Sequence, residues 1–246
     1  PMMWLAVISY AIQIYFDFSG YSDMAIGIAL LLGFKFPKNF DAPYKSATIT
    51  EFWRRWHISL SNWLRDYLYI SLGGNRKGRW RTYLNLLITM VLGGLWHGAA
   101  WKFVFWGAMH GVGLAVHKAS KPVLSKIPDI FPVKLLSWLV TFVFVSLLWV
   151  FFRAETWEDS WLIINNIFTT FDVAYIPVFW DVRMTWCIMM AVIIGFHMLP
   201  RRWFNAMGGY FVGSSWAVKF VLFIVVVQLV VQFMGEDVAP FIYFQF

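Results

Sequence analysis

The sequence contains little charge. Only 13% of its 246 residues are charged, whereas 60% are hydrophobic and 21% are aromatic. A soluble globular domain is usually about 25% charged and about 45–50% apolar. This shortage of charge argues against a soluble domain. It predicts an all-α fold, a polytopic transmembrane helical bundle with interfacial or re-entrant helices.

Cysteine and several well-known motifs are also lacking. Cys187 is the single cysteine and lies in an apolar run, which excludes an intrachain disulfide framework and a multi-cysteine metal site. A buried, inert thiol is expected there. The sequence has no P-loop, GxGxxG or GxSxG motif, so neither a phosphate-binding loop of those kinds nor a serine nucleophile elbow is predicted.

Long apolar runs predict the membrane spans. About 20 apolar residues cross the hydrocarbon core as a helix, and residues 133–152 and 216–234 are long enough, whereas residues 184–199 form a shorter run. Residues 2–16 and 25–34 are also apolar, and the polar motif FDFSGYSDM is expected to interrupt the helix between them. The 16 Trp and 10 Tyr suit a protein with two membrane–water interfaces.

The beginning of the chain does not resemble a signal peptide. It starts with Pro1, and the apolar residues that follow lack a basic n-region and a small-residue cleavage site. We expect this segment to be a membrane helix entered partway, with the N-terminal portion of a longer protein missing.

The net charge of +7 comes from lysines and arginines in short loops. We expect them to hold the loops on the cytoplasmic side of the membrane rather than to bind nucleic acid. Loops are expected at residues 35–46, at the strongly basic motif NRKGRWR (residues 75–81), at residues 118–134 and at residues 201–215.

Residues 48–74 form the most unusual segment, because large apolar residues recur there at helical spacing among five charges. Such a helix is too polar to face lipid, so it is expected to lie at the interface or to dip into the protein interior. Thr48 or Thr50 can cap its start, and Gly73 and Gly74 suit its end. Two apolar helices split around residues 93–98 are expected within residues 82–117, and an interfacial helix at residues 157–171.

Ionisable residues in a membrane domain are costly, and their default interpretation is functional. His97 is the strongest candidate among five histidines. Gly93, Gly94 and Gly98 remove side-chain bulk around it, so a substrate could reach the imidazole. Histidine is suited to taking a proton from a hydroxyl near neutral pH. The alternative is a histidine bonded to a backbone carbonyl in a packed core.

His57 lies among arginines. Arg54, Arg55 and Arg65 would favour an anion, such as the phosphates of a nucleotide-like acyl carrier. The alternative is an interfacial helix whose arginines contact lipid phosphates.

The other ionisable candidates are weaker. His110 and His117 are seven positions apart, roughly on one helix face. They could ligate a metal or haem, but such pairs more often line an aqueous cavity or cap a helix end. His197 is expected near a helix end. Asp17 and Asp23 either orient a histidine or, as we favour, belong to a structural polar network.

Taken together, these segments resemble the membrane-bound O-acyltransferase family, and most closely its bacterial alginate O-acetyltransferase branch. The resemblance is carried by YFDFSGYSDMAIG (residues 15–27), FPKNFDAPYKS (36–46), EFWRRWHISLSNWLRDYLYISLGGNRKG (51–78), LGGLWHGAAWKFVFWGAMHG (92–111) and the terminal FIYFQF (241–246). It is dense over about residues 10–115, whereas residues from about 120 to 235 are similar in hydropathy only.

The resemblance implies the site residues. Residues 1–246 would be the C-terminal part of one membrane domain of this family, with a catalytic core at about residues 10–115. The family's key pair matches His57 and His97. His97 would take the proton from an acceptor hydroxyl in a tunnel, and His57 would hold or polarise the thioester carbonyl. Substrate- or donor-binding candidates are Arg54, Arg55, Asn62, Trp96 and His110.

The resemblance also implies the activity. It is that of an O-acetyltransferase of the bacterial inner membrane, embedded in lipid, with acetyl-CoA or another acyl thioester as donor and with neither a bound cofactor nor a metal. The acceptor would be an exopolysaccharide such as alginate, or a periplasmic acetyltransferase partner. Three alternatives remain. They are D-alanyl transfer from a carrier protein to teichoic acid, a proton-relaying transporter or flippase, and a haem or metal protein using His97, His110 and His117.

Overall fold

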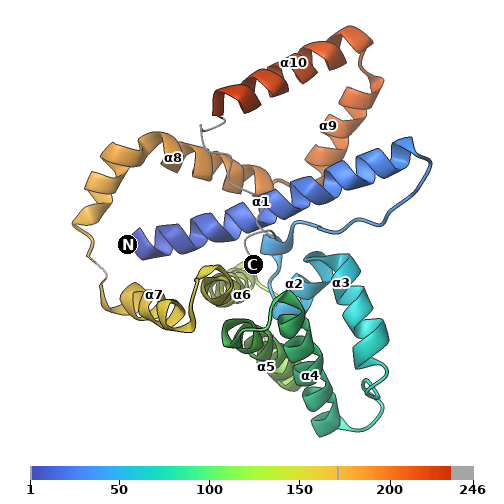
Figure 1. Ribbon diagram of the computed structural model, residues 1–246, viewed down its shortest axis with the longest axis vertical. Coiled ribbons are helices and arrows are strands. Elements are labelled where there is room, and N and C mark those ends of the chain that lie inside the picture. The colour runs from blue at the N-terminus through green and yellow to red at the C-terminus, as the bar shows by residue number, and fades with distance from the viewer. Residues whose placement is uncertain (1, 171, 234–246) are drawn as a thin grey trace. The chain divides into compact units, whose positions relative to one another are not determined.

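A computed structural model describes residues 2–170 and 172–233, and the terminal FIYFQF motif lies outside them. The described residues are helical and include no strand, which confirms the all-α fold class (Figure 1). Residues up to Val182 form one compact unit, and those from Arg183 belong to a second. The elements are α1 (Met2–Leu31), η1 (Pro43–Lys45), α2 (Ile49–Arg55), α3 (Ile58–Trp63), η2 (Leu64–Tyr69), α4 (Arg79–His97), α5 (Trp101–Leu124), α6 (Phe131–Arg153), α7 (Trp157–Thr169), α8 (Tyr175–Met198), α9 (Arg201–Gly213) and α10 (Trp216–Phe233).

Several helices are long and apolar enough to cross a membrane. Among the described residues these are α1, α6 and α8, and α9 with α10 makes a fourth candidate if the pair, bent by 120°, forms one broken span. The span predicted at residues 133–152 is confirmed by α6. These several candidate spans make the chain that of a multi-pass membrane protein. The helices α4 and α5 are not among the candidates.

Three predicted breaks in helices were wrong. The helix α1 runs through the FDFSGYSDM motif without interruption, since Gly20 is tolerated in a helix interior and the Ser19 hydroxyl donates back to the carbonyl of Phe16. The helix α5 continues to Leu124 with Pro122 inside it, and the proline removes a backbone donor only two residues before the helix ends. Residues 201–213 form α9 rather than a connection, with Pro200 immediately before the first helical residue.

Residues 48–74 form a re-entrant hairpin rather than one helix. Thr48 caps α2, since its hydroxyl accepts from the backbone N–H of Glu51 at 3.2 Å. The helix then breaks at Trp56 and His57, and α3 and η2 lead back to the glycine turn at Gly73 and Gly74, which both have positive φ. Phe52, Trp53, Trp56 and Leu64 are buried. The first part, α2, therefore packs into the protein interior, whereas α3 has no buried residue.

The hairpin packs between α5 and α4. In its first half, α2, the Thr50 hydroxyl lies 2.7 Å from Nδ1 of His117 on α5. In its second half, α3 and η2, Leu64 packs against Gly93 of α4. Near the end of the segment, the side chain of Asn85 donates to the carbonyl of Gly74 at 3.0 Å. The turn at His57 consequently lies deepest along these helices.

The helices α4 and α5 form an antiparallel pair whose backbones touch, and they lie side by side in Figure 1. A Cβ atom on Gly94 would lie 2.2 Å from the carbonyl oxygen of Phe103, and one on Gly107 would lie 2.2 Å from that of Met90. Only glycine at these positions permits this approach. The predicted split into two helices is confirmed, but it falls at residues 98–100, after Gly93 and Gly94.

Basic residues gather at one end of α4, α5 and α6. This basic end contains residues 75–81 before α4, Lys118 and Lys121 near the end of α5, and residues 125–134 leading into α6. Lys118 bonds to the side-chain oxygen of Asn75, which joins two of these segments. The other end contains the turn after His97 and the end of α6, where Lys102 donates to the carbonyl of Ala154 at 2.6 Å. Under the positive-inside rule, the basic end is the one expected in the cytoplasm.

The other helices show the patterns expected of a membrane protein. The helix α7 packs through Ile167 against Val7 of α1 and Val150 of α6; its predicted position at the interface stays a prediction. In the second unit, no described side chain of α8 or α9 is buried. The exposed apolar side chains of these helices are suited to contact with lipid.

Candidate functional site

His57 occupies the turn of the re-entrant hairpin in a strained backbone conformation. Its φ of 42° and ψ of 58° are left-handed, which is uncommon for any residue except glycine. The half-buried imidazole lies against the Phe18 ring of α1, with ring centroids 4.7 Å apart. Burial lowers the pKa of His57 to about 4, so the imidazole is neutral near pH 7.

Asn39 holds this turn from the preceding loop. Its side-chain oxygen lies 3.1 Å from Nδ1 of His57 and accepts from both the backbone N–H and the hydroxyl of Ser59, at 3.2 and 2.9 Å. Its amide nitrogen donates to the Ser22 hydroxyl on α1 at 3.2 Å. The backbone carbonyl of Asn39 accepts from Ile58 at 2.8 Å. Residues from α1, the loop and α3 thus meet at one side chain.

His97 is the last residue of α4 and is half-buried. Its ring packs edge-on against Trp106 of α5 and Phe152 of α6, with ring centroids 5.3 and 5.0 Å apart. Burial, followed by repulsion from His57, lowers the pKa of His97.

One aromatic cluster joins the two histidine positions. Trp56, the neighbour of His57, packs on Trp149 of α6 with ring centroids 4.9 Å apart. Trp149 in turn contacts Phe152, which contacts His97. The cluster fixes the hairpin turn and the end of α4 against the same part of α6.

His110 lies inside the same region but is fully buried. The indole nitrogen of Trp53 donates to its Nδ1 at 3.3 Å, and its ring packs against Trp106 with ring centroids 4.8 Å apart. Its Nε2 has no hydrogen-bond partner among the described residues. Trp106 thereby touches both His97 and His110.

A cavity of about 610 Å³ lies between the re-entrant hairpin and the α4–α5 pair, at the basic end. This volume is typical of a small-molecule site. Its lining includes both cationic and apolar side chains, together with the carboxylate of Glu51. The first are Arg54, Arg65, Lys118 and Lys121, and the second include Trp53, Leu64, Leu86, Met90 and Leu114. Such a lining fits a molecule with both a phosphate group and an apolar arm.

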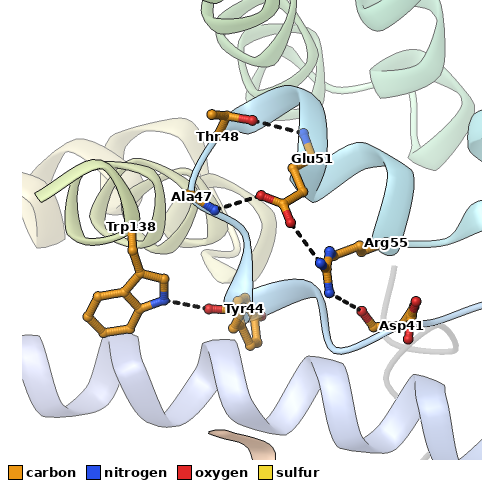
Figure 2. Close-up of polar contacts among 7 residues, drawn as sticks. All are labelled: Asp41, Tyr44, Ala47, Thr48, Glu51, Arg55 and Trp138. Atoms are coloured by element: carbon orange, nitrogen blue, oxygen red, sulfur yellow. Dashed lines mark hydrogen bonds and ion pairs between the residues drawn. The ribbon is translucent and has the colours of Figure 1, made fainter. Parts of the chain in front are cut away.

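The two neighbouring arginines of the motif have different surroundings. Arg54 is exposed in the cavity and forms no ion pair with any described residue. Arg55 instead pairs with Glu51 at 2.7 Å and donates to the backbone carbonyl of Asp41 at 3.2 Å (Figure 2). The Glu51 carboxylate also accepts from the N–H of Ala47 at 3.0 Å. The structure therefore places Arg55 away from the cavity, in the network that ties α2 to its entry loop.

The remaining predicted residues are distributed as follows. Asn62 lines the cavity, together with His117. Trp96 is 61% exposed and packs on the His97 ring. Asp17 is half-buried and Asp23 exposed on α1, and their proposed network stays a prediction. In the described part of the chain, no three His, Cys, Asp or Glu side chains come together to hold a metal ion.

Two residues of the site were not predicted from the sequence. Trp53 links the cavity to His110, and Asn39 contacts His57. The only signal for Asn39 was its place in the FPKNFDAPYKS motif, where no property of the residue alone distinguished it.

Comparison with known proteins decides the family. A sequence profile of the MBOAT, membrane-bound O-acyltransferase family, matches residues 1–155, which contain His57, His97, His110 and the cavity. This chain belongs to that family. The predicted resemblance is confirmed, and the histidines and the cavity all lie within the part of the chain that the MBOAT profile covers.

Several bacterial proteins are similar to the chain. A protein named probable alginate O-acetylase from Azotobacter vinelandii is 54% identical over 166 residues, which cover 68% of this chain and 32% of that protein. The peptidoglycan O-acetyltransferase of Helicobacter pylori is 49% identical over 164 residues, 67% of this chain and 31% of the enzyme. The teichoic acid D-alanyltransferase of Streptococcus thermophilus is 41% identical over 117 residues, 45% of this chain and 28% of the enzyme. The chain thus spans about a third of the length of the first two of these relatives.

Proposed function

We propose that this MBOAT chain provides the donor cavity and the histidine pair of a bacterial inner-membrane O-acyltransferase. The enzyme moves an acyl group, acetyl in the first instance, from a cytoplasmic thioester to an extracytoplasmic polysaccharide of the alginate type. The observation that carries the proposal is the placement of His57 at the turn of the re-entrant hairpin, beside Trp56, which the Trp149–Phe152 contact joins to His97. The high identity to an alginate O-acetylase supports acetyl as the acyl group.

The donor is proposed to bind in the cavity. Its cationic lining at the basic end suits the phosphates of acetyl-CoA, because charge-assisted bonds to phosphate are about twice as strong as neutral ones. The apolar lining suits the arm that carries the thioester. Arg54 and Asn62 are the predicted donor-binding residues that line this cavity.

The reaction is proposed to occur at the histidine pair. His97 removes the proton from the acceptor hydroxyl as its oxygen attacks the thioester carbonyl. The C–O bond forms, the C–S bond breaks, and the thiolate leaving group takes up the proton that His97 had accepted. His57 supplies the second imidazole beside the reacting atoms. The acceptor is a polysaccharide hydroxyl or a residue of a periplasmic acetyltransferase that passes the group on.

The test is an assay of the full-length protein in liposomes with labelled acetyl-CoA and acceptor. His97→Ala is expected to abolish thioester cleavage and transfer, while His197→Ala, a change in α8, leaves both intact. A thermal melt of each variant checks that it is folded. Equal turnover of wild type and folded His97→Ala would overturn the assignment.

D-alanyl transfer is the second candidate, favoured by the 41% identity to a teichoic acid D-alanyltransferase. The same assay separates the two functions when a D-alanyl carrier protein replaces acetyl-CoA. Turnover with the carrier protein alone would identify an aminoacyl transferase, whereas turnover with acetyl-CoA alone would identify an acetyltransferase.

A further inference from the structure

The side-chain amide of Asn39 faces His57 with its oxygen rather than its nitrogen, as its other hydrogen bonds show. The amide atom that faces Ser59 lies 3.2 Å from a backbone N–H, which can only donate a hydrogen bond. That atom must therefore be the side-chain oxygen. The opposite atom, the NH₂ group, donates to the Ser22 hydroxyl, which agrees with the same orientation.

The orientation of Asn39 determines which nitrogen of His57 is protonated. The Asn39 oxygen lies 3.1 Å from Nδ1 of His57, and an oxygen acceptor requires a proton on Nδ1. The Ser59 hydroxyl donates to the same oxygen at 2.9 Å and lies 3.3 Å from Nδ1, where it can accept from the same N–H. In a neutral imidazole the lone pair is then on Nε2.

We propose that Asn39 is a positioning residue, which fixes His57 in the Nδ1–H tautomer so that Nε2 presents a proton acceptor to the reacting groups. This inference rests on the proposed function of the histidine pair. It changes the role expected for His57, because a neutral imidazole in this tautomer cannot donate from Nε2 to a thioester carbonyl. His57 instead offers its unprotonated Nε2 as a hydrogen-bond acceptor beside the reacting groups, while His97 takes the single proton of the acceptor hydroxyl.

The surroundings of His57 are consistent with a neutral ring. Phe18 of α1 and Phe40 of the loop pack against it, and Ser59 and Asn39 supply the polar contacts. His97 is one titratable group that interacts with it, since His57 lowers the pKa of His97. Burial holds the pKa of His57 low, so protonation does not restore a donor at Nε2 near neutral pH.

The test compares Asn39→Ala and Asn39→Asp in the full-length protein, with Asn165→Ala on α7 as the matched control. Loss of the tautomer restraint in Asn39→Ala should reduce kcat by about 10-fold or more while the KM for acetyl-CoA stays unchanged. Asn39→Asp keeps an acceptor for Nδ1–H and adds a negative charge. It should retain more activity than Asn39→Ala and shift the acid limb of the kcat–pH profile to higher pH. The control should match wild type.

Two outcomes overturn the inference. One is wild-type kcat in Asn39→Ala. The other is an equal loss in both variants with an unshifted pH profile and lowered thermal stability, which would make Asn39 merely structural. His57→Ala separates the inference from the proposed function. If His57→Ala transfers normally, the histidine pair itself is wrong, whereas inactive His57→Ala with normal Asn39 variants refutes only the role of Asn39.

Discussion

The indole nitrogen of Trp53 donates a hydrogen bond to Nδ1 of His110 across 3.3 Å, in the buried layer behind the cavity. Removing either partner leaves a buried polar atom unpaired, which costs about 1–3 kcal/mol. Trp53→Phe and His110→Phe should each destabilise the protein, and the double variant should lose less than the sum. A double-mutant cycle of unfolding free energies in detergent measures this coupling, expected at about 1 kcal/mol. Strictly additive effects would contradict the hydrogen bond.

The adjacent arginines should separate donor binding from stability. Arg54→Gln removes a cation from the cavity lining, so the KM for acetyl-CoA should rise about 10-fold with little change in melting temperature. Arg55→Gln breaks the pair with Glu51 and the bond to Asp41, so it should cost about 1 kcal/mol of stability with little change in KM. Steady-state kinetics and thermal melts check both.

Lys126→Gln is the matched control for these charges. It removes a cation from the same basic end, at a position that does not line the cavity. The donor-site assignment would be wrong if Lys126→Gln raised the KM as much as Arg54→Gln. Such a result would indicate that overall charge at this end, rather than the cavity, attracts the donor.

The left-handed backbone of His57 predicts an unusual order of stability among variants at this position. Glycine adopts this conformation freely, whereas the same conformation costs alanine about 1–2 kcal/mol. His57→Gly should therefore be more stable than His57→Ala, the reverse of the order inside a helix, while both lose transfer activity. Asparagine also tolerates this region, so His57→Asn should likewise be more stable than His57→Ala. Equal melting temperatures for the Gly and Ala variants would show that this turn is not strained.

The break at His57 also shows what the sequence could not predict. Apolar spacing correctly indicated helical structure over residues 48–74, and the cap at Thr48 was readable locally. The break, however, is stabilised by a distant loop, since the N–H of Asp41 donates to the carbonyl of Arg55 at 2.9 Å and the N–H of Ile58 to Asn39. No local pattern encodes those contacts. For the same reason the sequence could not distinguish Arg54, which lines the cavity, from Arg55, which pairs with Glu51.

Stability should depend on pH through His57, which lies outside the candidate spans. Its pKa is about 4 in the folded protein because of burial, against about 6.5 when unfolded. Between these values the unfolded state binds more protons, so stability rises with pH through this window and is fully present above about pH 6.5. His57→Asn should show a shallower rise than wild type between pH 4.5 and 6.5. Other titratable groups contribute equally to wild type and His57→Asn. Identical slopes of stability against pH in the two proteins would therefore refute the lowered pKa of His57.

The contact between Gly94 and Gly107 should be the least tolerant point of the α4–α5 pair. A Cβ at either position would lie 2.2 Å from a backbone carbonyl oxygen, so the two helices would have to separate. Gly94→Ala and Gly107→Ala should each destabilise the protein by several kcal/mol, in the range of severe overpacking. Because Gly94 is less than one turn from His97, transfer activity should fall even in any folded fraction.

Gly20→Ala on α1 is the control for these substitutions. A Cβ there meets nothing within 4 Å, and alanine favours a helix over glycine by about 0.5–1 kcal/mol, so the change should be neutral or stabilising. Thermal melts of the three variants in one detergent make the comparison. If Gly94→Ala melted like Gly20→Ala, the backbones of α4 and α5 could not be in contact, and the position of His97 at the end of α4 would have to be assigned anew.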